Sequence, residues 1–208
     1  MNETSFVKFM TLFAIALFIA GTAGTYFLGT GIENLAGGAS SVGSPPGPAG
    51  PQDASDLLLE LSYFGPDYNV HLQSFDASNE QKERGVVTAA DRIWTRDSDA
   101  AGPLAIYQTI EIYDTVASAQ AGFAYWDEAT NTEEEFTVVE SSTIDMDADQ
   151  SAIYELEADD ATTPVKFMVR TVVRINSVIA VYDVADPSQY YVEQAEELAR
   201  LPWKTFAY

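Results

Sequence analysis

The stretch VKFMVRTVVRINSVIAVYDV, residues 165–184, carries the clearest strand pattern in the chain. Side chains that alternate between two faces are typical of a β-strand. One face takes Val165, Phe167, Val169, Val173 and Ile175, and the other takes Lys166, Arg170 and Arg174. Asn176 and Ser177 then form a tight reversal, after which a second strand continues. The stretch therefore predicts a β-hairpin in an antiparallel sheet.

Elements are also predicted on both sides of this hairpin. Downstream, Asp186 is expected to cap a helix that Pro187 opens. The buried face of that helix would contain Tyr191, Ala195, Leu198 and Leu201. Upstream, strand patterns cover residues 86–94, 104–112, 136–141 and 152–157, and residues 68–75 alternate more loosely. A second helix is expected after Asp114, because Val116, Ala119, Phe123 and Trp126 recur at helical spacing.

The predicted strand at residues 104–112 has two chemically different faces. Its apolar face holds Leu104, Ile106, Ile110 and Ile112, and its other face holds Tyr107, Thr109 and Glu111. This is the pattern of a half-buried strand. Because hairpins dominate the element order, we expect an α+β fold with a mainly antiparallel sheet and two helices packed on one face of it.

The end of this pattern resembles that of small PsbP-like domains. The features that carry the resemblance are a long strand, the Arg-Ile-Asn-Ser reversal at residues 174–177, a second strand and a closing amphipathic helix. By element order it covers roughly residues 86–201. The resemblance implies an extracytoplasmic accessory or binding role without catalysis, as in extrinsic photosystem proteins and bacterial lipoproteins. It transfers no functional residue, and this chain lacks the anchoring cysteine of the lipoprotein members.

Residues 9–32 form an uncharged segment between Lys8 and Glu33. As a helix it would be roughly 36 Å long, enough to cross a hydrocarbon core of about 30 Å. Lys8 and the amino terminus lie before the segment, whereas the next cation after it is Lys82. Because cytoplasmic flanks are enriched in Lys and Arg, we expect a single-pass anchor in the cell membrane with a cytoplasmic N-terminus. The C-terminal domain would then be extracytoplasmic, in the periplasm or outside the cell.

A cleaved signal peptide is the alternative interpretation of this segment. Small residues at Gly21, Thr22 and Ala23 could form a cleavage site, which would release an exported soluble acidic protein. Apolar residues resume at Tyr26, Phe27 and Leu28, which a signal peptide does not require. In a retained helix, Ala20, Gly21 and Gly24 would allow another membrane helix to approach closely.

The rest of the chain divides into a linker and one domain. Residues 33–55 are rich in Gly, Pro, Ser and Ala and contain almost no large side chain, so they predict a linker. Residues 56–208 are long enough to bury a core of their own. The predicted organisation is thus an N-terminal tail and anchor at residues 1–32, a linker, and an acidic domain.

Charge and composition exclude several function classes. The chain carries 32 Asp and Glu against 10 Lys and Arg, a net charge of −22, which argues against nucleic-acid binding. Three interpretations of the acidity remain: a solvated surface adapted to salt, steering of a basic partner, or weak cation binding. The absence of cysteine excludes disulfides and thiolate metal sites. His71 is the only histidine, so a zinc or haem ligand set is not expected.

One metal site can be suggested from the sequence. Asp145, Asp147 and Asp149 alternate in an acidic turn, and carboxylates in a loop can converge on calcium. The EF-hand pattern fails, since Gln150 stands where it needs Gly and Leu156 where it needs Glu. A solvated turn is the alternative interpretation. No Gly-rich phosphate loop occurs in the domain, and no cofactor is predicted.

Two segments are candidate docking surfaces for a protein partner. One is the acidic loop at Glu133, Glu134 and Glu135, which could contact a basic extracytoplasmic protein. The other is the aromatic C-terminal tail, with Trp203, Phe206 and Tyr208. We therefore expect a non-catalytic accessory subunit of an integral membrane protein complex, respiratory or photosynthetic, that braces or docks components at its extracytoplasmic face. The alternatives are a membrane-tethered sensor of a small ligand and the exported soluble protein.

Overall fold

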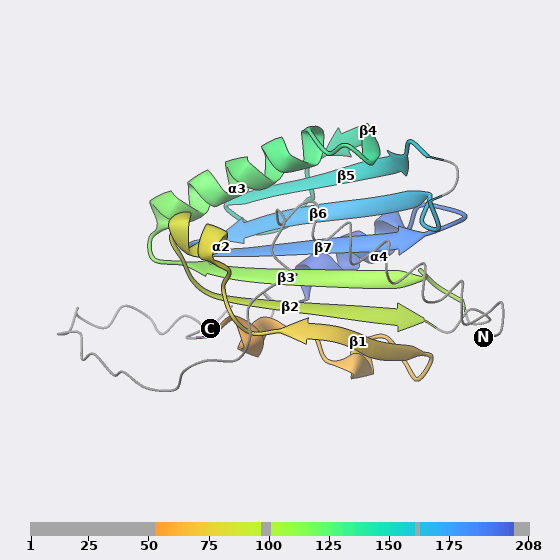
Figure 1. The fold of residues 1–208 in the computed structure, drawn as a ribbon, viewed down its shortest axis with the longest axis horizontal. Helices are drawn as coiled ribbons and strands as arrows, with labels where there is room; N and C mark the ends of the chain where they lie inside the picture. The colour runs from red at the N-terminus through yellow and green to blue at the C-terminus, as the bar shows by residue number, and fades with distance from the viewer. Residues whose placement is uncertain (1–52, 97–100, 161–162, 202–208) are drawn as a thin grey trace. The chain divides into compact units, whose positions relative to one another are not determined.

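The computed structural model describes residues 53–96, 101–160 and 163–201 (Figure 1). The predicted membrane segment with Ala20, Gly21 and Gly24, most of the linker, and the aromatic tail with Trp203, Phe206 and Tyr208 lie outside the described residues. Within the described residues, no helix is both long enough and apolar enough to cross a membrane.

The described chain folds around one antiparallel sheet (Figure 1). Its strands are β1 (Tyr68–Ser74), β2 (Val86–Arg96), β3 (Ala105–Tyr113), β4 (Phe136–Ser142), β5 (Gln150–Ala158), β6 (Phe167–Ile175) and β7 (Val178–Asp186). The spatial order is β1-β2-β3-β7-β6-β5-β4, and every neighbouring pair is antiparallel. The helices are α2 (Asn79–Glu83), α3 (Val116–Asn131) and α4 (Val192–Arg200), with short 3-10 turns at Ala54–Leu57 and Leu61–Tyr63. The predicted α+β class with a mainly antiparallel sheet is confirmed.

The hairpin predicted from residues 165–184 forms the centre of this sheet. β6 and β7 pair from Phe167 opposite Asp186 to Ile175 opposite Val178. Asn176 lies at the reversal with φ 54°, in the left-handed region that Asn tolerates better than most residues. Its backbone N–H donates to Oδ2 of Asp149 at 2.6 Å, which ties the turn to the start of β5.

The two long helices cover opposite faces of the sheet, so the expectation that both pack on one face is wrong. Ala195 and Leu198 of α4 share a hydrophobic core with Val169 and Val173 of β6. By contrast, α3 contacts side chains of the other face, including Arg170. Neighbouring residues of a strand point to opposite faces, which places one helix on each side (Figure 1). The domain is therefore a three-layer arrangement.

The helix starts also differ from the sequence prediction. Thr115, rather than Asp114, caps α3, and its side chain accepts from the N–H of Ser118. α4 begins at Val192, because Asp186 uses its carboxylate on the N–H and hydroxyl of Ser188 and so stabilises a turn before the helix. The correction at Asp186 arises because Asp also caps short turns, which sequence spacing does not distinguish from helix starts.

The two faces of the sheet have different chemistry. The face under α4 is mainly hydrophobic, with Trp94, Ile106 and Tyr182 fully buried. The face under α3 buries charged groups, among them Glu111 and Arg170. β3 is therefore covered on both sides, and its expected half-buried character is wrong at Glu111.

Candidate functional site

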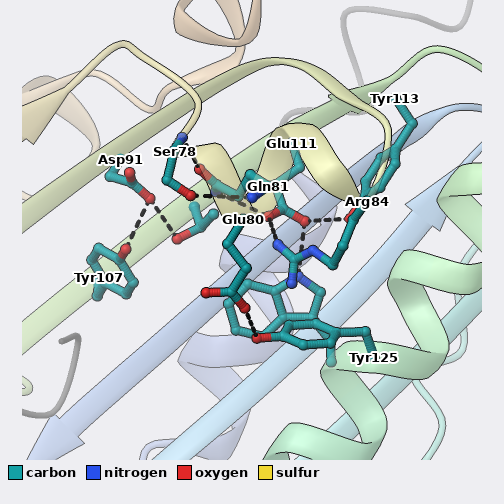
Figure 2. A network of polar contacts seen from close by, with 11 residues as sticks. Ser78, Glu80, Gln81, Arg84, Asp91, Tyr107, Glu111, Tyr113 and Tyr125 are labelled. Atoms are coloured by element: carbon teal, nitrogen blue, oxygen red, sulfur yellow. Dashed lines mark hydrogen bonds and ion pairs between the residues drawn. The ribbon is translucent and has the colours of Figure 1, made fainter. Parts of the chain in front are cut away.

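The carboxylate of Glu111 is fully buried on β3, between the sheet and two helices (Figure 2). Its Oε1 accepts from Nε2 of Gln81 at 3.0 Å and from a guanidinium nitrogen of Arg84 at 2.8 Å. Its Oε2 accepts from the hydroxyl of Tyr113 at 2.7 Å and from Nε1 of Trp126 at 2.9 Å. Four donors therefore surround one buried carboxylate, which is what a buried charge requires.

Two of these donors, Gln81 and Arg84, are positioned by the short helix α2. Ser78 and Gln81 form a capping box, in which the Ser78 side chain accepts from the N–H of Gln81. The Gln81 side chain returns the contact, since its Oε1 accepts from the N–H of Ser78 at 2.8 Å. Its amide nitrogen is then directed at Glu111. Gly85, with φ 88°, allows the chain to leave α2 directly after Arg84.

Arg84 also joins α2 to α3 (Figure 2). Its guanidinium carbon lies 3.8 Å from the ring centroid of Tyr125, within the range of a cation–π contact. The Tyr125 hydroxyl donates to Oε1 of Glu80 at 3.0 Å. Burial, with the charge of Glu111, raises the pKa of Tyr113 far above its usual value, so its hydroxyl remains a donor to Glu111.

Arg170 is the second buried ionic centre on this face. Its Nε and one terminal nitrogen bind the two carboxylate oxygens of Asp183 at 2.7 and 2.8 Å, which is a bidentate pair. The other terminal nitrogen contacts Oε2 of Glu133 at 3.1 Å and Oγ1 of Thr130 at 3.3 Å. Burial raises the pKa of Glu133 to about 7, although the Arg170 charge opposes this shift. The raised pKa of Glu133 therefore lies near neutrality.

Polar residues continue across the sheet in register. Tyr107 of β3 lies opposite Asp183, Asp183 opposite Arg170, and Arg170 opposite Tyr154 of β5. The Tyr154 hydroxyl donates to Asp127 on α3. These groups form a polar row across four strands beneath α3.

Another carboxylate, that of Asp91 on β2, lies beside this row (Figure 2). Its Oδ1 accepts from the hydroxyls of Tyr107 and Thr109, each at 2.8 Å. Burial raises the pKa of Asp91, and the two hydrogen bonds partly oppose the shift. Asp91 therefore adds a further hydrogen-bonded acid to the layer.

The charged groups of this buried layer contact one another. A carboxylate offers about four lone-pair sites, and Glu111 has four donors, so its capacity to bind a ligand is already used. Arg170 is likewise engaged by two carboxylates and a hydroxyl. The layer joins α2 and α3 to the sheet through charged hydrogen bonds.

The structure places the predicted calcium residues in different roles. All three are exposed, but Asp149 also accepts from a guanidinium nitrogen of Arg174 at 3.2 Å and from the N–H of Asn176. In the part of the chain that the structure describes, no three acidic or histidine side chains gather as a metal-binding group. The calcium site stays a prediction, and Asp149 has a structural role at the β6–β7 turn.

The acidic loop does not act as one surface. Glu133 turns inward to Arg170, and its side chain is only 6% exposed, whereas Glu134 and Glu135 are exposed. A docking patch there would use the last two residues alone. His71 lies exposed on β1.

The comparisons with known proteins show the fold alone. No protein-family model and no curated protein matches the chain. The crystal structure of the extracellular domain of PknH from Mycobacterium tuberculosis is similar, with a TM-score of 0.55 and 10% sequence identity. The match covers 73% of this chain and 93% of that one. The resemblance to PsbP-like domains stays a prediction.

Sequence reasoning missed the buried ionic layer. Glu111 and Arg170 are charged residues within strands, and alternation assigned them only to a face opposite the apolar one. The sequence signal was a residue of opposite charge at the facing position of a neighbouring strand, such as Asp183 opposite Arg170. The register of the predicted hairpin contains this pair, whereas the donors to Glu111 from α2 and α3 are revealed only by the tertiary structure.

Proposed function

We propose that this protein is a non-catalytic, membrane-tethered accessory subunit that holds an acidic domain at the extracytoplasmic face of an integral membrane protein complex. Its predicted helix would pack within the complex, and its Pro-rich linker would set the distance to the domain. The host would be a respiratory or photosynthetic assembly, as the PsbP-like resemblance implies.

One observation carries the proposal. The buried ionic groups of the domain bind one another, with Glu111 held by four donors and Arg170 by Asp183 and Glu133. A catalytic acid or base must reach a substrate proton, directly or through one water. Charged groups that are hydrogen-bonded to one another inside the domain instead stabilise a rigid body. A rigid body suits a bracing or docking role.

The test is purification of the tagged full chain from membranes in a mild detergent, followed by native mass spectrometry. We expect co-purification with a larger membrane complex at constant stoichiometry. Gly21→Leu with Gly24→Leu should weaken this association, because the larger side chains prevent close helix approach. Thr22→Leu, on the opposite side of the predicted helix, is the matched control. A lone monomer under mild extraction would refute the proposal.

A membrane-tethered sensor of a small ligand is the second candidate. It is favoured by the fold similarity to a domain described as extracellular. The same native mass spectra distinguish the two functions, since a sensor would retain a small-molecule adduct on a monomer. Addition of such a ligand should also raise the unfolding temperature, because a ligand that binds the native state stabilises it.

A further inference from the structure

Strand β1 forms one edge of the sheet. It is the terminal strand of the order, and among the described residues it pairs only with β2 (Figure 1). The opposite side of an edge strand presents a row of backbone N–H and C=O groups that can pair with another chain. β1 therefore has the geometry for addition of one more strand.

Two apolar side chains of β1 are exposed to an unusual degree, and further exposed apolar residues flank the strand. Val70 is 43% exposed, Leu72 is 39% exposed, and Phe75, just after the strand, is 47% exposed. Leu61 and Tyr63 of the preceding 3-10 turn add exposures of 40% and 59%. β1 also contains no Asp, Glu, Lys or Arg, although the chain has a net charge of −22. These exposed apolar groups lie in and beside an uncharged edge strand of an acidic protein, which favours a contact surface there.

The other edge strand is protected by contrast. β4 carries Glu140, which lies opposite Glu155 of β5, and the register shifts between Val138 and Glu140. Charged residues and irregular pairing are devices that block strand addition. β1 also has a register shift, between Val70 and Leu72, but no charge. Strand addition is therefore favoured at β1 over β4.

Charges at the ends of β1 indicate what the added strand must be. Asp67 precedes the strand, Asp76 follows it, and both are exposed. We propose that the β1 edge binds an extended segment of a protein partner that has apolar side chains at alternate positions and Lys or Arg at both ends. The proposal rests on the accessory role for the existence of a protein partner, and it names the chemistry of that partner.

A second copy of this chain fits the edge less well. Antiparallel self-pairing of β1 would place the Asp67 end of one copy beside the Asp76 end of the other, so like charges would meet at both ends. Like charges across a strand pair destabilise it. Two domains of strongly negative charge would also repel each other over a Debye length of about 10 Å at 0.1 M salt. A segment with cationic ends would avoid both the like charges at the strand ends and the repulsion between two acidic domains.

The test is selection of ten-residue peptides from a random library on the full chain in lipid nanodiscs. We expect the selected peptides to alternate apolar residues and to carry Lys or Arg at both ends. Replacing those cations by Glu should weaken binding about tenfold at low salt, and by less at 1 M salt, where the Debye length is about 3 Å. An N-methyl scan should reduce binding at every second position only, because alternate N–H groups of an added strand face its neighbour.

Variants of the two edge strands locate the site. Val70→Lys and Leu72→Lys should each weaken peptide binding by about tenfold or more, since edge lysines oppose strand addition. Val139→Lys is the matched control, because Val139 is an apolar residue with 52% exposure on the other edge strand. Circular dichroism spectra would confirm that all three variants fold.

Several outcomes would overturn the proposal. They are a failure to select peptides, selected peptides without alternation or cationic ends, an N-methyl scan without a period of two, and an equal effect of Val139→Lys. A dimer of the full chain that Leu72→Lys dissociates would assign the edge to a second copy. If the membrane complex co-purifies equally with Val70→Lys, the accessory role stands and the β1 site does not. If no complex co-purifies but the peptides bind as expected, only the accessory role fails.

Discussion

At the residue scale, Glu111 shows how a charge can be kept inside this domain. Burying an isolated carboxylate is very unfavourable, and each of its four donors comes from a different residue. These donors lie on α2, on β3 itself, on α3 and at the residue that follows α2. Loss of the charge therefore affects several contacts between elements at once.

We expect Glu111→Gln to destabilise the domain by about 3 kcal/mol, the scale for breaking a buried ion pair. The Gln amide nitrogen is itself a donor, so it could not accept the hydrogen bonds that the Glu111 carboxylate now accepts. Arg84 would also lose its carboxylate partner. Urea unfolding of the full chain measures the change in the free energy of unfolding. Glu134→Gln, in the exposed loop, is the control and should change it little. Equal values for the two variants would contradict the structural role of Glu111.

Glu133 should make stability depend on pH near neutrality. Burial raises its pKa from 4.5 to about 7, so between these values the native state binds a proton that the unfolded state has lost. The free energy of unfolding should therefore fall as pH rises through this window, by at most about 1.4 kcal/mol per pH unit for one proton.

Comparison with Glu133→Gln isolates this contribution, because the other carboxylates titrate equally in both proteins. The variant keeps an acceptor for Arg170 but cannot ionise. The difference between the two free energies of unfolding, measured from pH 4 to 8, should change across the window. A difference that stays constant with pH would refute the shifted pKa of Glu133.

At the element scale, α3 packs closely on the sheet at one glycine. A Cβ added at Gly122 would lie 2.2 Å from the hydroxyl oxygen of Tyr113. That tyrosine is itself buried and bonded to Glu111, so it has little freedom to move. A helix-breaking residue at the centre of α3 is therefore explained by the close approach of the helix and β3.

Gly122→Ala should accordingly destabilise the domain, although Ala favours a helix over Gly by about 1 kcal/mol. The steric clash displaces either α3 or Tyr113 and disturbs the Glu111 contacts. Ala121→Gly lies at an exposed neighbouring position of α3. It should lower the free energy of unfolding only by the difference in helix propensity, about 1 kcal/mol. Thermal unfolding compares the two. If Gly122→Ala raises the unfolding temperature, the close packing of α3 is wrong.

At the scale of the whole molecule, self-repulsion opposes folding. A net charge of −22 on 208 residues destabilises the compact state, and salt screens this repulsion. We expect the free energy of unfolding to rise between 0.1 and 1 M NaCl. Sucrose at equal osmolarity provides the control for effects unrelated to charge. Stability that falls with salt would indicate that internal ion pairs dominate the electrostatics instead.

Much of the element pattern could be predicted from the sequence. Alternation located β6, the Asn176 reversal and β7, because a strand in contact with a core must repeat every two residues. Helical spacing located α3 and α4, although Thr115 and Val192 replaced the expected starts. Of the predicted docking residues, Glu133 proved to be buried, because only the fold reveals Arg170 beneath it.

The sequence by itself determined local periodicity, net charge and the placement of an uncharged segment before a single domain, since these depend on neighbours along the chain. Only the tertiary structure decided that α3 and α4 cover opposite faces and that Glu111 meets Arg84 and Trp126. It also decided that β1 is an edge strand. These features depend on strand order, which arises from contacts between residues distant in sequence, and local patterns contain no record of such contacts.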